Sequence, residues 1–238
     1  MKKTSFFILA FAAFLSVGLY SCSKDNDDSN ETATSGGGGD TFDGNWVDLG
    51  LPSGLLWADR NLGAETPEGY GDYIAWGETE AKDSYSWSAY RYAEGINKLT
   101  KYCSKTASGN EGFTDNLTTL QPMDDAATAK WGDAVRMPTR AEWQELSDNT
   151  TATWTTRNGV YGRLMTASNG NSIFLPAAGR HQASSVDGDG EFGYYWTNAL
   201  YTSDPSYAYD FVVVEDSQFE SMGYRNRGQS VRAVRSAR

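Results

Sequence analysis

The sequence predicts an α+β domain with little helix, short strands and long structured loops. Only two segments have a helical pattern, three short segments are rich in β-branched and aromatic residues, and 25 of the 238 residues are glycine. Glycine, together with Asn, Asp and Ser, interrupts regular structure and favours turns. Short elements separated by many turns leave much of the chain to loops.

The two predicted helices are short. Residues 139–142 read Thr-Arg-Ala-Glu, a capping box in which the Thr hydroxyl and the Glu carboxylate accept hydrogen bonds from backbone N–H groups at a helix start. Trp143 and Leu146 follow three positions apart, so they share one face of that helix. A second helix is predicted over residues 124–131, where two aspartates favour the positive end of the helix dipole.

Strands are predicted over residues 172–175, 207–214 and 230–234, each bounded by turn-forming residues. Side chains alternate between the two faces of a strand. In the middle segment this alternation places four large side chains on one face: Tyr207, Tyr209, Phe211 and Val213.

Composition and charge exclude several classes of protein. Hydrophobic residues make up 39% of the chain, which is enough for a packed core, and the mean hydropathy of -0.56 excludes a polytopic membrane protein. The net charge of -11 makes nucleic-acid binding an unfavourable function, because that binding depends on basic residues that neutralise phosphates. His181 is the single histidine, which excludes a site built from two imidazoles of this chain.

Residues 1–21 are predicted to be a lipoprotein signal peptide. Two lysines precede an apolar run over residues 6–15 and then small residues, which is the pattern of a secretory signal. The run is shorter than the roughly 20 residues that a membrane-spanning helix needs. Residues 19–22, LYSC, resemble a bacterial lipobox, in which the cysteine, here Cys22, is acylated and anchors the protein in a membrane. An ordinary signal peptide cleaved nearby is the alternative.

Residues 22–43 are predicted to be a tether, and residues 44–238 the folded domain. The acidic stretch over residues 23–28 resembles the export signal that places Bacteroidota lipoproteins on the outer face of the outer membrane. Ser, Thr and Gly dominate residues 29–40, a composition typical of flexible linkers. We therefore expect a lipid anchor in the outer membrane and exposure at the cell surface.

Several segments together resemble one family, the Fibrobacter succinogenes major paralogous domain. In chain order they are residues 47–54 (VDLGLPSG), 56–58 (LWA), 61–64 (NLGA), 71–78 (GDYIAWGE), 124–127 (DDAA), 131–132 (WG), 136–139 (RMPT), 174–179 (FLPAAG), 193–196 (GYYW) and 227–232 (RGQSVR). Residues 136–143 also resemble the R-L-P-T-E-A-E-W signature of formylglycine-generating enzymes. The resemblance implies a C-type-lectin-like fold with two small helices, a small twisted and mostly antiparallel sheet, and extensive loops.

Enzymes of this fold use two sets of catalytic residues, and this sequence contains neither set. Formylglycine-generating enzymes use a pair of cysteines, whereas Cys103 is the single cysteine after residue 22. The iron-dependent sulfoxide synthases use several histidines. Nothing connects Cys103 to His181 in a nucleophile–base arrangement, and no motif indicates the carboxylate pair of a glycoside hydrolase. We therefore expect no catalysis and no cofactor, a buried inert Cys103 and a solvated loop position for His181. A formylglycine-generating activity is the distant alternative.

The predicted binding region lies in residues 192–224, because C-type-lectin-like folds place ligands on their loop face near this part of the chain. Ten aromatic residues, six of them tyrosine, are interspersed there with Ser, Asn and Asp. This is the composition of an antibody-like binding surface, and aromatic rings also suit the faces of sugars. Trp196 and Phe211 are expected in the core. The candidate ligand-binding residues are Tyr194, Asn198, Tyr201, Ser203, Tyr207, Gln218 and Tyr224.

Calcium is possible but weakly indicated. The motifs of the sugar-binding lectin calcium site are replaced here by Gln-Pro-Met at residues 121–123 and Trp-Thr-Asn at residues 196–198. Asp187, Asp189 and Glu191 alternate with glycine on a turn, which could hold a weakly bound calcium ion. A solvated turn is the alternative.

Arginines gather near the C-terminal end of an otherwise acidic chain. Arg227 and Arg232 are expected to pair with carboxylates and fix the last strand, and a site for an anionic ligand is the alternative. Four tryptophans within the family-like segments are expected in the core: Trp57, Trp76, Trp131 and Trp143.

The sequence thus favours a non-catalytic surface lipoprotein, anchored to the membrane through Cys22, whose domain binds a glycan or a protein. A structural subunit or adhesin component that contacts other envelope proteins is the alternative.

Overall fold

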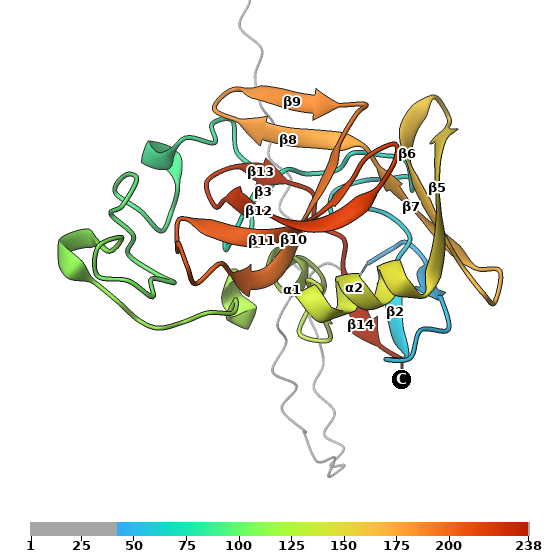
Figure 1. Ribbon diagram of the computed structural model, residues 1–238, viewed down its shortest axis with the longest axis horizontal. Coiled ribbons are helices and arrows are strands. Elements are labelled where there is room, and N and C mark those ends of the chain that lie inside the picture. The colour runs from blue at the N-terminus through green and yellow to red at the C-terminus, as the bar shows by residue number, and fades with distance from the viewer. Residues whose placement is uncertain (1–41, 238) are drawn as a thin grey trace, which may run out of the picture. The chain divides into compact units, whose positions relative to one another are not determined.

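Strands dominate the part of the chain that this computed structural model describes, residues 42–237 (Figure 1). They form mostly antiparallel sheets, with two α-helices and long loops between them, which confirms the predicted α+β class. The predicted signal peptide, Cys22 and residues 22–41 of the predicted tether lie outside the described residues. Within residues 42–237, no helix is long and apolar enough to cross a membrane.

The largest sheet carries most of the predicted binding region. Its strands lie in the order β12 (Gln218–Tyr224), β11 (Tyr207–Val213), β10 (Gly193–Leu200), β8 (Ala178–Gln182), β13 (Gly228–Gln229) and β3 (Ile74–Ala75), and β9 (Ser185–Asp189) also pairs with β8. The pair β10–β8 is parallel, and the other pairs in this sheet are antiparallel. Strand β12 is at one edge of the sheet.

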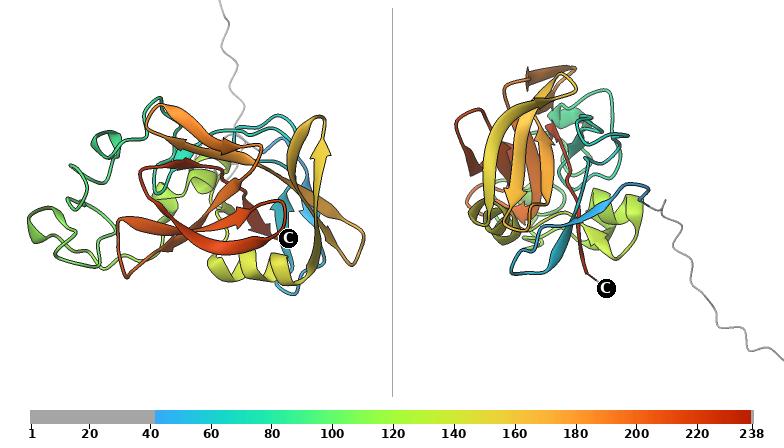
Figure 2. Two further views of the ribbon diagram at one scale, coloured as in Figure 1. Left: turned by 45° about the horizontal axis from the view of Figure 1, so that its top comes forward. Right: turned by 90° about the vertical axis from the view of Figure 1, so that its right-hand side faces the viewer.

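Two smaller sheets complete the domain. One has the order β1 (Trp46–Asp48), β2 (Leu55–Ala58), β14 (Val234–Ser236) and β4 (Val135–Arg136). The other consists of β5 (Thr150–Arg157), β6 (Val160–Ala167) and β7 (Ser172–Pro176). Figures 1 and 2 show the β5–β7 sheet at one end of the domain and the long loops of residues 76–125 at the opposite end. Three short 3-10 helices interrupt these loops: η1 (Trp87–Ala89), η2 (Asn110–Gly112) and η3 (Pro122–Asp124).

Both predicted helices are present. The capping box opens α2 (Arg140–Asp148): the Glu142 N–H donates to the Thr139 hydroxyl at 3.2 Å, and the Thr139 N–H donates to the Glu142 carboxylate at 2.7 Å. Helix α1 (Ala126–Trp131) begins later than predicted because Asp125 is its N-cap, with a carboxylate that accepts from two backbone N–H groups. Asp124 instead accepts hydrogen bonds from two tyrosine hydroxyls and from Lys101.

Removal of the cap on α2 is expected to destabilise the domain modestly. Thr139→Ala leaves the Glu142 N–H without its side-chain acceptor, and the expected loss in the free energy of unfolding is about 1 kcal/mol. Urea denaturation measures it. Ser184→Ala, at an exposed turn position, is the control. Equal stability of the two variants would contradict the role of the cap.

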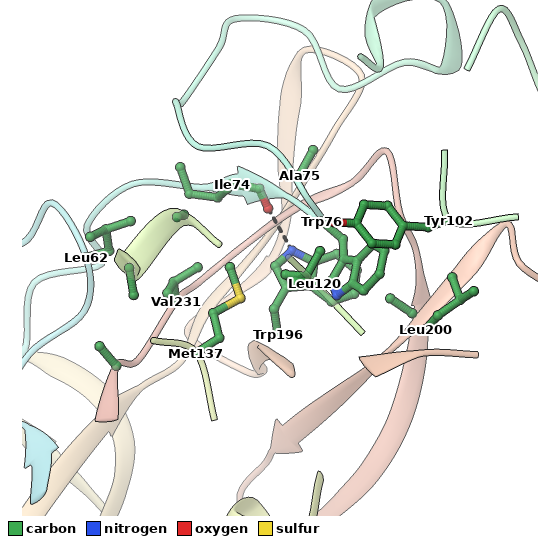
Figure 3. Packing of buried hydrophobic residues seen from close by; sticks show 14 of the residues in the cluster. Leu62, Ile74, Ala75, Trp76, Tyr102, Leu120, Met137, Trp196, Leu200 and Val231 are labelled. Carbon is green, nitrogen blue, oxygen red and sulfur yellow. Dashed lines mark hydrogen bonds between the residues drawn. The ribbon is translucent and has the colours of Figure 1, made fainter. Parts of the chain in front are cut away.

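Two hydrophobic clusters form the core. The first surrounds Trp76 and Trp196, whose indole N–H groups donate to the carbonyls of Thr197 at 2.8 Å and Ile74 at 2.7 Å (Figure 3). The second surrounds Trp143, which is 1% exposed. The predicted burial of Trp57, Trp76, Trp143, Trp196 and Phe211 is confirmed, whereas Trp131 is only half-buried at the edge of the first cluster.

Two details of the predicted strands are corrected. Phe211 and Val213 are buried, but Tyr207 and Tyr209 on the same face are only half-buried. Residues 230–233 are not part of a continuous strand. Here the chain crosses from the largest sheet at β13 to the four-stranded sheet at β14, and its carbonyls accept from the N–H groups of Leu62 and Ala58 instead.

Arg232 is buried without a carboxylate, which contradicts the predicted ion pair. Its guanidinium donates to the Asn61 side-chain oxygen at 2.7 and 3.0 Å and to the carbonyls of Ala58 at 3.2 Å and Phe174 at 2.9 Å. Burial lowers the pKa of Arg232 to about 10, so the group stays charged at neutral pH. Neutral oxygens of two separate segments, residues 58–61 and strand β7, therefore satisfy this charge, and Arg232 holds these segments together.

Candidate functional site

Three predicted ligand-binding residues meet in a group that we call the tyrosine cluster: Tyr201, Tyr207, Tyr209 and Tyr224. The rings of Tyr207 and Tyr224 face each other across β11 and β12 with centroids 4.2 Å apart, and the ring of Tyr201 meets that of Tyr209 edge-on at 5.3 Å. All four are half-buried. The sequence therefore located a real aromatic surface, although Tyr209 was missed.

The other predicted residues are dispersed. Asn198 lines a separate hollow of about 370 Å³ beside α1, and its backbone pairs with Pro138 and Leu120. Ser203 is exposed, and Gln218 donates to the Ser147 hydroxyl on α2 at 3.2 Å. Tyr194 lies on the opposite face of the sheet from Tyr207. These four side chains do not form one site with the tyrosine cluster.

A larger hollow than the one beside α1 lies elsewhere. It has a volume of about 530 Å³ and lies where the β5–β6 hairpin meets the β9–β10 and β11–β12 turns. We call it the aromatic groove. Its lining residues are Trp154, Tyr161, Gly190, Glu191, Phe192, Val214, Glu215 and Asp216. The groove thus combines three aromatic rings with three carboxylates.

A tight hairpin places two of these rings side by side. Asn158 and Gly159 have φ angles of 48° and 84°, the left-handed conformations that a type I′ turn needs. This turn sets the register of β5 and β6, in which Trp154 is opposite Arg163 and Thr156 is opposite Tyr161. The rings of Trp154 and Tyr161 consequently share one face, with centroids 6.3 Å apart and planes 13° from parallel. They form a stacked aromatic pair in the wall of the groove, which we call the platform.

Arg163 fixes the opposite wall of the groove. This side chain is 6% exposed, and its guanidinium donates to the carbonyls of Val214 at 2.9 Å and Glu215 at 3.0 Å. These two bonds tie the β11–β12 turn to β6. Arg163 therefore holds the backbone at Val214 and Glu215, two of the residues that line the groove.

Sequence reasoning missed the platform of the groove. The signal was present in residues 150–161, where an Asn-Gly pair follows a Thr-rich segment of strand-forming residues. Such a pair between two strand-like segments predicts a hairpin. The alternation of a strand would then have placed the two aromatic side chains on one face.

The structure does not gather ligands around the predicted calcium residues. Asp187 and Asp189 lie on β9, and Glu191 lies in the turn that follows. Asp187 forms an ion pair with Arg180 at 3.4 Å. No group of three or more acidic, His or Cys side chains within residues 42–237 is close enough to hold a metal ion. Calcium binding there stays a prediction.

The two groups considered for catalysis lie in different surroundings. Cys103 is buried, its S–H donates to the Lys105 carbonyl at 3.1 Å, and burial raises the pKa of its thiol. His181 is not in a solvated loop but on β8, half-buried between the rings of Tyr73 and Tyr85, and burial lowers its pKa. Its position on β8 corrects the predicted solvated loop.

Asp210 is a buried carboxyl group on β11. It is 1% exposed, and one of its oxygens accepts from the Gln229 side-chain amide at 2.9 Å. Its other oxygen has no hydrogen-bond partner among the described residues. The pair fits only because residue 223 is glycine: a Cβ there would lie 2.4 Å from the Gln229 nitrogen and 2.9 Å from Asp210. Burial raises the pKa of Asp210 to about 7.

This raised pKa predicts a pH-dependent cost in stability. In the unfolded chain an aspartate ionises near pH 3.9, so above that pH the folded state binds the Asp210 proton more tightly than the unfolded state does. Stability relative to Asp210→Asn should therefore fall as the pH rises from about 4 to 7 and then level off. Urea denaturation of both proteins at several pH values measures the difference. A constant difference between pH 4 and 8 would contradict the prediction.

Comparison of the chain with protein-family models, with curated proteins and with solved structures finds no match.

Proposed function

We propose that this chain is a non-catalytic lipoprotein of the outer membrane, anchored through acylated Cys22, whose C-type-lectin-like domain binds a glycan in the aromatic groove. The resemblance of its sequence segments to the Fibrobacter succinogenes major paralogous domain supports the fold and the location. The observation that carries the ligand class is the presence of a stacked aromatic pair and carboxylates in one hollow.

Sugar rings have apolar C–H faces and polar hydroxyl edges. The parallel rings of Trp154 and Tyr161 offer a surface on which such a face can stack, and Tyr161 is 51% exposed and accessible. The carboxylates of Glu191, Glu215 and Asp216 accept hydrogen bonds from hydroxyl groups at the edge. A mainly apolar hollow with a few fixed polar groups is the usual form of a small-ligand site.

A second candidate function is contact with another envelope protein through the tyrosine cluster. Four half-buried tyrosines on adjacent strands supply large rigid area with polar tips, which favours protein recognition. Arg140 adds a guanidinium 3.6 Å from the ring of Tyr209. This surface would serve a structural subunit or an adhesin component.

The test is binding of residues 42–238 to an array of host and microbial glycans, with and without calcium. Trp154→Ala and Tyr161→Ala each remove half of the platform, and each is expected to weaken glycan binding by about tenfold or more. Phe113→Ala, which removes an exposed aromatic ring from a loop outside the groove, is the matched control. Calcium dependence would revive the site predicted at Asp187, Asp189 and Glu191.

Two outcomes would overturn the glycan proposal. One is the absence of binding to any glycan on the array. The other is binding that both groove variants retain and Tyr207→Ala loses. Stoichiometric capture of an envelope protein that depends on Tyr207 would establish the second candidate instead.

A further inference from the structure

Two arginines come from neighbouring segments at the β8–β13 pair of the largest sheet. Arg180 is on β8, and Arg227 is in the turn between β12 and β13. The two arginines are close in the fold because their chain neighbours, His181 and Gly228, are opposite each other in the β8–β13 pair. Both side chains are half-buried, so their guanidinium groups have limited freedom.

A continuous series of aromatic contacts joins Arg180 to the groove. Phe192 lines the groove, and its ring stacks on that of Tyr194 at 5.7 Å with planes 15° from parallel. The Arg180 guanidinium lies 4.7 Å from the ring centre of Tyr194. A ligand that leaves the groove past Phe192 therefore reaches Tyr194 and Arg180 next.

The positive charge of this pair is poorly neutralised. Arg180 has one ion pair, a long one of 3.4 Å with the exposed carboxylate of Asp187. Arg227 has no carboxylate partner among residues 42–237, and its contact is with the ring of Tyr224 at 5.1 Å. Burial lowers the pKa of Arg227, and the nearby positive charge of Arg180 lowers it further. Although the chain has a net charge of -11, neither Arg180 nor Arg227 has a carboxylate closer than 3.4 Å among the described residues.

A buried carboxyl group, that of Asp210, does not neutralise the two arginines. Asp210 is within electrostatic reach of both arginines but is buried, with one oxygen bonded to Gln229 and the other without a partner. It forms no ion pair with either arginine. The Nε of Arg180 is likewise buried without a hydrogen-bond partner among the described residues.

We propose that Arg180 and Arg227 form a subsite for an anionic group, and that the ligand of the groove is a glycan with a carboxylate or a sulfate ester next to the sugar that stacks on Trp154 and Tyr161. Guanidinium groups bind both anions through paired N–H donors. The carboxylates of the groove repel negative charge from the stacked sugar itself. The ligand is thus neutral at one position and acidic at the next.

This inference rests on the proposed function for its glycan, but the subsite itself can be tested alone. Sodium sulfate, sodium glucuronate and neutral glucose are titrated into isotope-labelled protein, and the side-chain NMR signals of the arginines are followed. Sulfate or glucuronate should shift the Arg180 signal in a saturable way that weakens with added salt, whereas glucose should not. Absence of any shift with both anions would overturn the subsite.

The glycan array then tests the complete ligand through pairs that differ only in their acidic group, such as oligogalacturonate and its methyl ester, or a sulfated glycan and its desulfated form. Wild-type protein should prefer the acidic member about tenfold or more, and Arg180→Gln and Arg227→Gln should abolish that preference. Arg140→Gln is the matched control, because Arg140 also stacks on a tyrosine but is neutralised by Glu220 at 2.6 Å.

The two proposals fail in different ways. Equal binding of acidic and neutral members, sensitive to Trp154→Ala, would overturn the anionic subsite and leave the glycan groove in place. An anion-induced shift that Arg180→Gln removes, together with an array without any binding, would support the subsite and overturn the groove. A preference for acidic glycans that Arg140→Gln removes equally would also contradict the subsite, because general charge would then explain it.

Discussion

Replacement of Arg232 by methionine is expected to lower the free energy of unfolding by about 3 kcal/mol. Methionine fills much of the same space, but it leaves the Asn61 side-chain oxygen and the carbonyls of Ala58 and Phe174 buried without a donor. Each unsatisfied acceptor costs about 1–3 kcal/mol, and the removal of a buried charge offsets part of this loss. Urea denaturation at neutral pH measures the change.

Arg91→Met is the control, since Arg91 is exposed and stacks only on the surface of Tyr92. A loss below about 1 kcal/mol at position 232 would mean that the apolar replacement compensates for the missing bonds, as is known for some buried ion pairs. Arg232→Lys should recover part of the loss, because an ammonium group can reach some of the same acceptors but lacks the planar fork of a guanidinium.

Trp143→Ala is expected to cost about 3–5 kcal/mol, the range for removal of a large aromatic side chain from a core. Trp143 is 1% exposed, stacks on Phe211 at 4.8 Å with planes 10° from parallel, and meets Trp57 at 4.9 Å and Tyr195 at 5.5 Å. The alanine variant leaves a large void between α2 and the sheets. Thermal and urea denaturation both report the loss.

The matched control is Trp154→Ala, which removes the same side chain from the half-buried wall of the groove. Its expected cost is about 1 kcal/mol, close to the value of a single aromatic contact. Similar losses for the two variants would contradict the assignment of Trp143 to the core and of Trp154 to the half-buried wall of the groove.

Local signals in the sequence predicted the fold well where one short segment determines the structure. The residues of the capping box at Thr139 and Glu142 bond to each other within a single helical turn, so no distant partner is needed. The break at residues 230–233 could not be predicted in this way. The break depends on hydrogen bonds from distant backbone N–H groups, here those of Leu62 and Ala58. The hydrophobic periodicity of residues 230–234 does not indicate these partners.

The candidate site was only partly predictable for a related reason. Aromatic enrichment located Tyr201, Tyr207 and Tyr224, because neighbouring strands bring residues close in sequence together. The aromatic groove combines side chains from three separate turns and hairpins, and Trp154 lies almost 40 positions before Phe192. Arg232 was expected beside a carboxylate because a positively charged side chain commonly pairs with a negatively charged one. In the structure the guanidinium is buried and donates to neutral oxygens, and no sequence pattern identifies these partners.

The path of residues 228–236 also constrains when the domain can fold. In the largest sheet β13 lies between β8 and β3, and in the four-stranded sheet β14 lies between β2 and β4. Each of these two sheets therefore has an interior strand that comes from the C-terminal part of the sequence. During synthesis, the largest sheet cannot be completed until Gln229 has left the ribosome, and the four-stranded sheet cannot be completed until Ser236 has. Pairing over such long sequence separations also slows folding. Almost all of the described residues must therefore be synthesised before the domain reaches its final fold.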